Sequence, residues 1–128
     1  MATHLAIFVG DAITKILHGE KTVDVRLSQV MSPPFRRVMS GDTILLKQSS
    51  GSIVGEAQAD NVLYYDHLTP ETVQDLKNRY GAAIAMPEQF WQNKATARYA
   101  TVIFLKNPKH LVGIVPMQKN DRRGWVVL

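Results

Sequence analysis

The amino-acid sequence predicts an α+β fold in which a five- or six-stranded, mostly antiparallel sheet closes towards a barrel and carries short helices at its rim. Three observations lead to this prediction. Strand-like patterns recur along the chain, polar turns separate them, and helical patterns are few and short. We expect residues 1–128 to form a single domain, because a chain of this length can bury one core.

Short apolar runs and alternating apolar and polar residues, the two patterns typical of strands, account for much of the chain. They occur, in order, at residues 4–9, 21–26, 43–47, 52–65 and 99–105. The polar turn QSSG joins the third and fourth of these segments into a predicted hairpin. Residues 110–116 and 124–128 are weaker candidates for two further strands.

Helical signals are confined to three segments, at residues 11–19, 69–81 and 87–94. In the first, Asp11 suits the N-cap and Gly19 the C-terminal stop. In the second, the Thr69 oxygen can cap a helix that has proline at its first position and that ends at Gly81. Pro87 opens the third segment. We place these short helices at the rim of the sheet.

The composition limits the classes of function open to this chain. Cysteine is absent, which excludes disulfides, thiol nucleophiles and cysteine-bound zinc and fits a reducing cytoplasm. Residues 1–17 lack the basic start of a signal peptide, and Asp11 interrupts their apolar run. No apolar run approaches the roughly 20 residues that span a bilayer. We therefore expect a cytoplasmic protein with no membrane partner.

Charge is unevenly distributed along the chain. Residues 1–88 carry a net charge of −2, whereas residues 89–128 carry +6. Such an asymmetry is typical of a protein that binds a polyanion. It is equally compatible with a surface whose charges only keep the protein in solution.

The segment GEKTVDVR, residues 19–26, raises a more specific question. Strand alternation sends its valines to one face of the sheet and Thr22, Asp24 and Arg26 to the other. Lys21 precedes the strand and can lean over the same face. The segment therefore predicts either a site with two cations, a carboxylate and a hydroxyl, or a surface ion pair that contributes at most about 1 kcal/mol.

This segment resembles the signature of the ASCH domain family, of the PUA-like superfamily, usually written G-x-K-x-x-E-x-R. The matching positions are Gly19, Lys21 and Arg26. Asp24 stands where the family typically has glutamate. The later segments SGDTILLK and ARYATVIFL resemble the family in the same order. Residues 106–128 fall outside the resemblance and are a candidate C-terminal extension.

The resemblance implies a small β-barrel whose cleft, beside the signature, binds RNA or nucleotides. It also implies two alternatives within the family, a single-strand ribonuclease and an amidohydrolase acting on acetylated cytidine with a lysine, a threonine and a glutamate. The lysine matches Lys21, but the threonine falls at Asp24, and a carboxylate cannot replace a hydroxyl in kind. Glu56 and Glu71 are candidates for the glutamate.

The chemistry of the segment favours binding over catalysis. For Lys21 to act as a base, its pKa must fall from about 10.4 to about 7–8. Burial or Arg26 would lower it, whereas Asp24 would raise it. Lys21 is therefore better suited to hold a phosphate, and Asp24 to orient Arg26 or to accept a hydrogen bond from a base. Lys21 and Asp24 are the catalytic candidates if the protein is an enzyme.

Two further groups of residues could contribute to a nucleic-acid site. Phe35 lies beside Arg36 and Arg37 on a predicted loop, where the ring could stack on a base and the arginines could contact phosphate. The alternative is an ordinary polar loop with one anchored aromatic. Arg122 and Arg123, in the segment DRRGW, could line the cleft or belong to a solvated turn.

We therefore predict a domain that binds single-stranded RNA or a nucleotide. The alternatives are a metal-independent hydrolase of RNA or of a modified nucleoside, and a protein-interaction module. The histidines and carboxylates show no metal-ligand spacing, and no cofactor fingerprint is present. We expect no metal, no cofactor, and a monomer or weak homo-oligomer.

Overall fold

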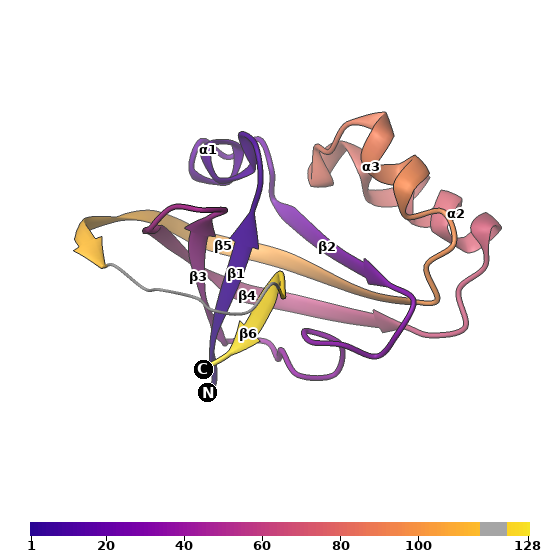
Figure 1. Ribbon diagram of the computed structural model, residues 1–128, viewed down its shortest axis with the longest axis horizontal. Coiled ribbons are helices and arrows are strands. Elements are labelled where there is room, and N and C mark those ends of the chain that lie inside the picture. The colour runs from indigo at the N-terminus through magenta and orange to yellow at the C-terminus, as the bar shows by residue number, and fades with distance from the viewer. Residues whose placement is uncertain (116–122) are drawn as a thin grey trace.

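The computed structural model describes residues 1–115 and 123–128, with only the backbone described for residues 112–115. Its helices and strands, shown in Figure 1, are β1 (Thr3–Phe8), α1 (Ala12–Leu17), β2 (Val23–Ser28), β3 (Thr43–Gln48), β4 (Ile53–Tyr65), α2 (Pro70–Ile84), α3 (Glu88–Asn93), β5 (Tyr99–Val115) and β6 (Trp125–Val127). None of the described helices is long and apolar enough to cross a membrane.

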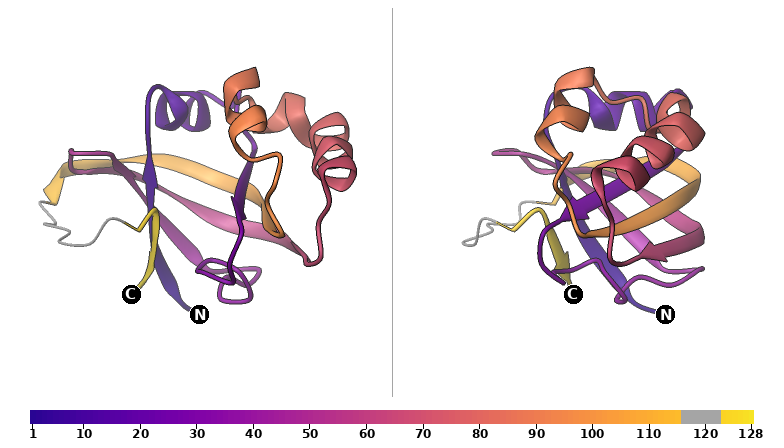
Figure 2. Two further views of the ribbon diagram at one scale, coloured as in Figure 1. Left: turned by 45° about the vertical axis from the view of Figure 1, so that its right-hand side comes forward. Right: turned by 90° about the vertical axis from the view of Figure 1, so that its right-hand side faces the viewer.

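The strands of the described residues form one six-stranded sheet in the order β2-β5-β4-β3-β1-β6. All neighbours pair antiparallel except β1 and β3, which are parallel. The sheet curls into a half-barrel (Figure 2). The predicted α+β fold, with a mostly antiparallel sheet of six strands and helices at the rim, is thus confirmed. The closure is incomplete, because β2 and β6 remain as the two edges.

Strand β5 corrects the expectation of two separate strands at residues 99–105 and 110–116. The sequence Lys-Asn-Pro-Lys resembles a turn, but the strand continues through it. Gln58 faces Lys106 and Glu56 faces Lys109, so one residue of β4 opposes two of β5. Asn107 has a φ of 53°, and Pro108, which has no N–H to donate, sits in this bulge where the ladder is interrupted.

The helix boundaries follow local capping chemistry only in part. At the start of α2, Thr69 Oγ1 accepts from the Thr72 N–H at 3.3 Å and Thr72 Oγ1 accepts from the Thr69 N–H at 2.7 Å, which is a capping box. The helix continues past Gly81 to Ile84, and its C-cap is Ala85, which has a left-handed φ of 55°. Asp11 occupies the N-cap position of α1 as predicted, but its side chain makes no hydrogen bond to the helix.

Two apolar clusters lie on opposite faces of the sheet, since Val62 and Ile103 belong to one and their strand neighbours Leu63 and Val102 to the other. In one, α1 packs with β1 and β3, through side chains that include Ile16, Phe8 and Leu46. In the other, α2 and α3 pack with β2 and β5 through residues such as Leu76 and Trp91. The cavity described next is lined by members of both clusters, so the candidate site lies where the two cores meet.

Candidate functional site

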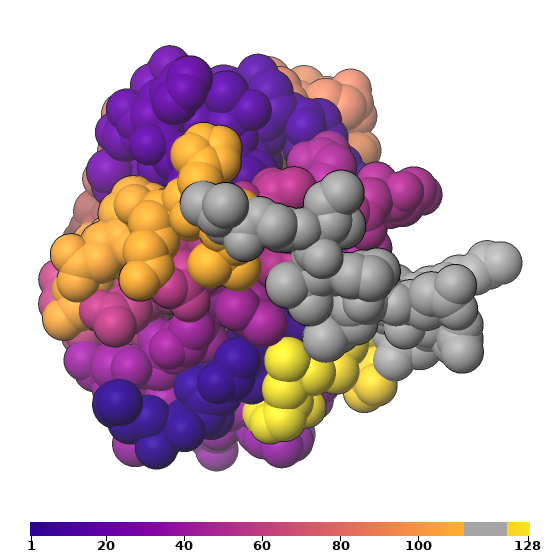
Figure 3. Space-filling model, turned by 90° about the vertical axis from the view of Figure 1, so that its left-hand side faces the viewer, coloured from indigo at the N-terminus to yellow at the C-terminus, as the bar shows by residue number. Residues whose placement is uncertain are grey.

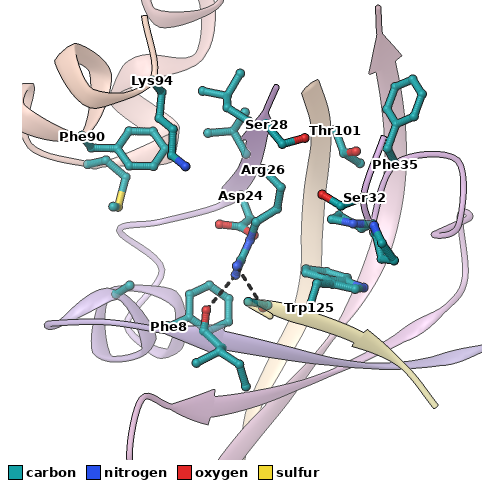
Figure 4. A pocket seen from close by; sticks show the side chains of 18 of the residues that line it. Phe8, Asp24, Arg26, Ser28, Ser32, Phe35, Phe90, Lys94, Thr101 and Trp125 are labelled. Carbon is teal, nitrogen blue, oxygen red and sulfur yellow. Dashed lines mark hydrogen bonds and ion pairs between the residues drawn. The ribbon is translucent and has the colours of Figure 1, made fainter. Parts of the chain in front are cut away.

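A cavity of about 470 Å³ opens between β2, at one edge of the sheet, and β1 with β6, at the other (Figure 4). Its volume is within the range of small-molecule sites, about 300–1,000 Å³. The polar and charged side chains that line it are Lys21, Asp24, Arg26, Ser28, Ser32, Lys94 and Thr101. The aromatic side chains that line it are Phe8, Phe35, Phe90, Tyr99 and Trp125.

Arg26 joins three separate segments at the base of the cavity. Its Nε donates to Asp24 Oδ2 at 2.8 Å, Nη1 donates to the Gly124 carbonyl oxygen at 3.2 Å, and Nη2 donates to the Ile7 carbonyl oxygen at 3.2 Å. The guanidinium carbon lies 4.8 Å from the ring centre of Phe8 and 5.2 Å from that of Trp125. Arg26 is therefore a structural clamp between the strands as well as a lining residue.

Lys21 and Asp24 are buried beside this clamp, with only 2% and 5% of each residue exposed. The Lys21 ammonium lies 3.5 Å from Asp24 Oδ1 and donates to the Ile84 carbonyl oxygen, at the end of α2, at 2.7 Å. Gly19, with a φ of 83°, allows the chain to turn from α1 into this position. The alternative of a surface ion pair at Asp24 and Arg26 is thus wrong, because the carboxylate is enclosed.

Burial and charge act in opposite directions on these two groups. Burial lowers the pKa of Lys21 below 10.5, and Arg26 adds to this effect although Asp24 opposes it. Burial alone would raise the pKa of Asp24, but the charges of Arg26 and Lys21 and their hydrogen bonds outweigh it and hold that pKa below 3.8. Asp24 is therefore an anion at neutral pH, and both of its oxygens already face cations.

Lys94 is the cavity cation that sequence reasoning missed. It follows α3 directly, it is half-buried, and its side chain extends towards the middle of the cavity (Figure 4). Its ammonium forms no ion pair with the residues that the structure describes. No local signal in the sequence marks Lys94, because it is one of several lysines in a basic segment. It differs from Lys21 and Arg26 in that its charge is available to a ligand.

Other predicted site residues lie at different places relative to the cavity. Thr22 is exposed and does not line it, since it precedes β2 and its carbonyl oxygen accepts from the Leu105 N–H. Phe35 is buried and forms part of the wall, which agrees with the alternative of a loop with one anchored aromatic. Arg36 and Arg37 are exposed outside the lining, and Arg36 lies over the Phe35 ring at 5.3 Å.

The C-terminal segment contributes through its backbone and its aromatic residue. Gly124 and Trp125 line the cavity, in agreement with the hypothesis that DRRGW reaches the cleft. Arg123 is exposed and outside the lining, and Arg122 falls outside the described residues. Figure 3 shows β6 on the surface beside N-terminal residues, to which it is joined by its pairing with β1.

Acidic residues from an earlier part of the chain neutralise part of the positive charge of residues 89–128. Lys106 Nζ lies 3.6 Å from Asp60 Oδ1, and Lys109 Nζ lies 2.9 Å from Glu56 Oε1, both across the β4–β5 ladder. Glu56 is therefore committed to an ion pair outside the cavity, and Glu71 is exposed in the first turn of α2. Neither glutamate lines the cavity. In the described ranges, no group of three histidine, aspartate or glutamate side chains could hold a metal ion.

The curved sheet, with its cavity between β2 and β1, has the fold of ASCH proteins of known structure. The chain is similar to the ASCH protein of Zymomonas mobilis, with a TM-score of 0.73 and 18% identity over 98% of this chain and 87% of that one. A tyrosine-to-phenylalanine mutant of the same protein gives a TM-score of 0.73 at 17% identity, with 98% and 89% covered.

A weaker likeness, at a TM-score of 0.50 and 11% identity, links 88% of the chain to 75% of the N-terminal domain of McrB from Staphylothermus marinus. No protein-family profile and no curated protein sequence matches the chain. At these identities the comparisons establish the fold, and the function must be argued from the site.

Proposed function

We propose that this protein binds single-stranded RNA or a nucleotide in the cavity, with Lys94 contacting phosphate and the aromatic wall contacting a base. The observation that carries the proposal is the position of Lys94. It places an ammonium without an ion-pair partner among the described residues at a cavity lined by five aromatic rings. A cation beside aromatic surfaces is the combination that single-stranded nucleic acids require.

Polar groups at the cavity support recognition of a base edge. The hydroxyls of Ser28, Ser32 and Thr101 line it and can donate or accept hydrogen bonds. Asp24 holds Arg26, and this contact fixes the shape of the base of the cavity. In this proposal Lys21, Asp24 and Arg26 shape the site. The charge that contacts the ligand is the ammonium of Lys94, which directly follows α3.

The test is the salt dependence of binding to a labelled single-stranded RNA of mixed sequence. If about three phosphates are neutralised, log affinity should fall with log salt at a slope near −2. Lys94→Gln should make this slope shallower by about 0.7, the value for one phosphate on a single strand. Lys106→Gln removes the same charge from the outer face of β5 and should leave the slope unchanged.

Displacement of the RNA by a free mononucleotide separates the two ligands. Displacement at low concentration favours a nucleotide, and resistance to it favours a strand. Absence of binding at low salt, a flat salt response, or equal effects of the two lysine variants would contradict the proposal.

A hydrolase is the second candidate, and one observation favours it. Lys21 lines the cavity and burial lowers its pKa, which moves it in the direction that a general base requires. Incubation of the wild type with acetylated cytidine and with single-stranded RNA tests this candidate. Product that disappears in Lys21→Ala would favour it over binding alone. Neither binding nor product would leave the protein-interaction module.

A further inference from the structure

A buried histidine–aspartate pair stands behind the cavity and is not used in the proposed function. His4, on β1, has no exposed surface, and Asp42, before β3, is 3% exposed. His4 Nε2 lies 2.8 Å from Asp42 Oδ2. Asp42 Oδ2 also accepts from the Met39 N–H at 2.9 Å, and its Oδ1 accepts from the Ala2 N–H at 3.0 Å. These bonds tie the N-terminal strand to the loop before β3.

The surroundings of Asp42 fix its charge. Burial by itself would raise the pKa of Asp42, but the hydrogen bonds from His4, Met39 and Ala2 hold it below 3.8. The carboxylate can therefore only accept a hydrogen bond, and His4 Nε2 must carry the proton that lies between them.

The opposite nitrogen of the His4 ring faces a group that can only donate. Trp125 Nε1 lies 3.1 Å from His4 Nδ1, and an indole N–H has no acceptor capacity. His4 Nδ1 is accordingly the unprotonated acceptor. The two rings lie 5.6 Å apart and are tilted by 53°. Asp42 thus selects the tautomer of His4 that can hold the indole.

Trp125 carries this restraint into the cavity. It is 2% exposed, it lines the cavity, and its ring lies 5.2 Å from the guanidinium carbon of Arg26. It also begins β6, which is three residues long and pairs with β1 alone among the described strands. So short a strand supplies few backbone bonds to orient a large side chain. The His4 bond supplies a further restraint, at the far end of the indole.

We propose that His4 is a positioning residue for the cavity. It does not line the cavity, but through Nδ1 it fixes the indole of Trp125 as the wall that backs Arg26. This inference rests on the proposed function where it concerns affinity, and on geometry alone where it concerns the orientation of Trp125.

Two substitutions separate the two nitrogens of His4. His4→Asn places an amide oxygen near the position of Nδ1, so it can accept from Trp125, but it is too short to reach Asp42. His4→Gln places an amide nitrogen near the position of Nε2, so it keeps the bond to Asp42 and loses the acceptor for the indole. If His4 positions Trp125, His4→Gln should disturb the indole more than His4→Asn. If His4 only holds Asp42, His4→Asn should have the larger effect.

The first readout needs no ligand. In proton–nitrogen correlation spectra, the indole N–H resonance of Trp125 should keep its hydrogen-bonded shift in His4→Asn and lose it in His4→Gln. The indole of Trp91, in the other core cluster, is the internal control. Loss of the shift in His4→Asn with retention in His4→Gln would overturn the positioning role, and so would two unchanged spectra.

The second readout is affinity for the labelled single-stranded RNA. His4→Gln should weaken it roughly five- to tenfold, the loss expected for one hydrogen bond, and His4→Asn by less than about threefold. Equal affinities in the two variants, or the reverse order, would overturn the role. If the wild type binds no RNA, the proposed function fails while the spectra still decide the positioning of Trp125.

Trp125→Phe keeps the test decisive if a His4 variant does not fold. It retains an aromatic ring and removes the indole N–H, so it should weaken RNA binding several-fold in a protein that remains folded. Where His4→Gln folds, adding it to Trp125→Phe should cause little further loss, because both changes break the same bond. An unchanged affinity in Trp125→Phe, or full additivity of the two losses, would contradict the inference.

Discussion

Arg26 donates from Nη2 to the carbonyl oxygen of Ile7 at 3.2 Å, and this bond joins β2 to β1 across the open side of the half-barrel. β2 is one edge of the sheet and β1 lies next to the other edge strand, β6, and no backbone ladder connects β2 with β1. A side chain therefore makes a connection that strand pairing makes elsewhere in the sheet. The cavity owes its shape to that connection, because both strands line it.

Replacement of this arginine should cost more than a change of one surface charge. Arg26→Lys keeps the charge but cannot reach Asp24, Ile7 and Gly124 with one ammonium group. We expect the free energy of unfolding to fall by about 2–3 kcal/mol, measured by urea denaturation. Arg36→Lys is the control, since Arg36 is 67% exposed and its ion pair with Asp66 is 3.7 Å long. Equal denaturation midpoints for both variants would mean that the clamp does not stabilise the fold.

Asp24 should make stability depend on pH in the acid range. Its pKa in the folded protein lies below the 3.8 of the unfolded chain, so its contribution is complete above that value and is lost as pH falls through the folded pKa. Asp24→Asn should therefore cost about 3–5 kcal/mol at neutral pH, and the difference from wild type should shrink in acid.

Urea denaturation at a series of pH values measures this effect. The control is Asp75→Asn, on the exposed face of α2, for which we expect a change within about 0.5 kcal/mol throughout. A gap between wild type and Asp24→Asn that stays constant on acidification would contradict the prediction.

Two glycine-to-alanine substitutions should change the free energy of unfolding in opposite directions. A Cβ at Gly124 would lie 3.3 Å from Arg26 Nη1, and the guanidinium cannot easily withdraw, because Phe8 and Trp125 flank it. Gly124→Ala should lower the free energy of unfolding by about 1–3 kcal/mol. In α2, a Cβ at Gly81 would meet Lys77 Cγ at an ordinary 3.5 Å, so Gly81→Ala should raise it by about 0.5–1 kcal/mol. Thermal or urea denaturation distinguishes the signs, and stabilisation by Gly124→Ala would refute the close contact.

Periodicity was enough to predict most of the elements. Alternation located β2, β3 and β4, and Thr69 followed by proline located the start of α2, because these signals act within a few residues. The parallel pairing of β1 with β3 could not be predicted in the same way, since it depends on how distant strands meet. The continuity of β5 through the bulge at Asn107 could not be predicted, because bulges and turns use the same residue types.

The sequence predicted the charged residues of the candidate site but not the elements that enclose them. The spacing of Lys21, Asp24 and Arg26 placed them together, and the structure does so. Their burial could not be foreseen, because the elements that cover them, such as the end of α2 and its Ile84 carbonyl, are remote in sequence. Lys106 and Lys109 form ion pairs with acidic residues of β4, which are also remote in sequence. The net charge of residues 89–128 therefore overstates the positive charge that this part of the surface presents.

The position of β6 beside β1 also sets the order in which the protein can fold. Gly124 follows Arg26 by 98 residues, and bringing two points so far apart together costs roughly 4 kcal/mol of chain entropy before any constant term. Contacts of such separation form late, after local helices and hairpins. As the chain is synthesised from its N-terminus, Asp24 and Arg26 are made long before the carbonyl and the indole that complete their surroundings. A nascent chain can thus pair β4 with β5 while the candidate site still lacks a wall.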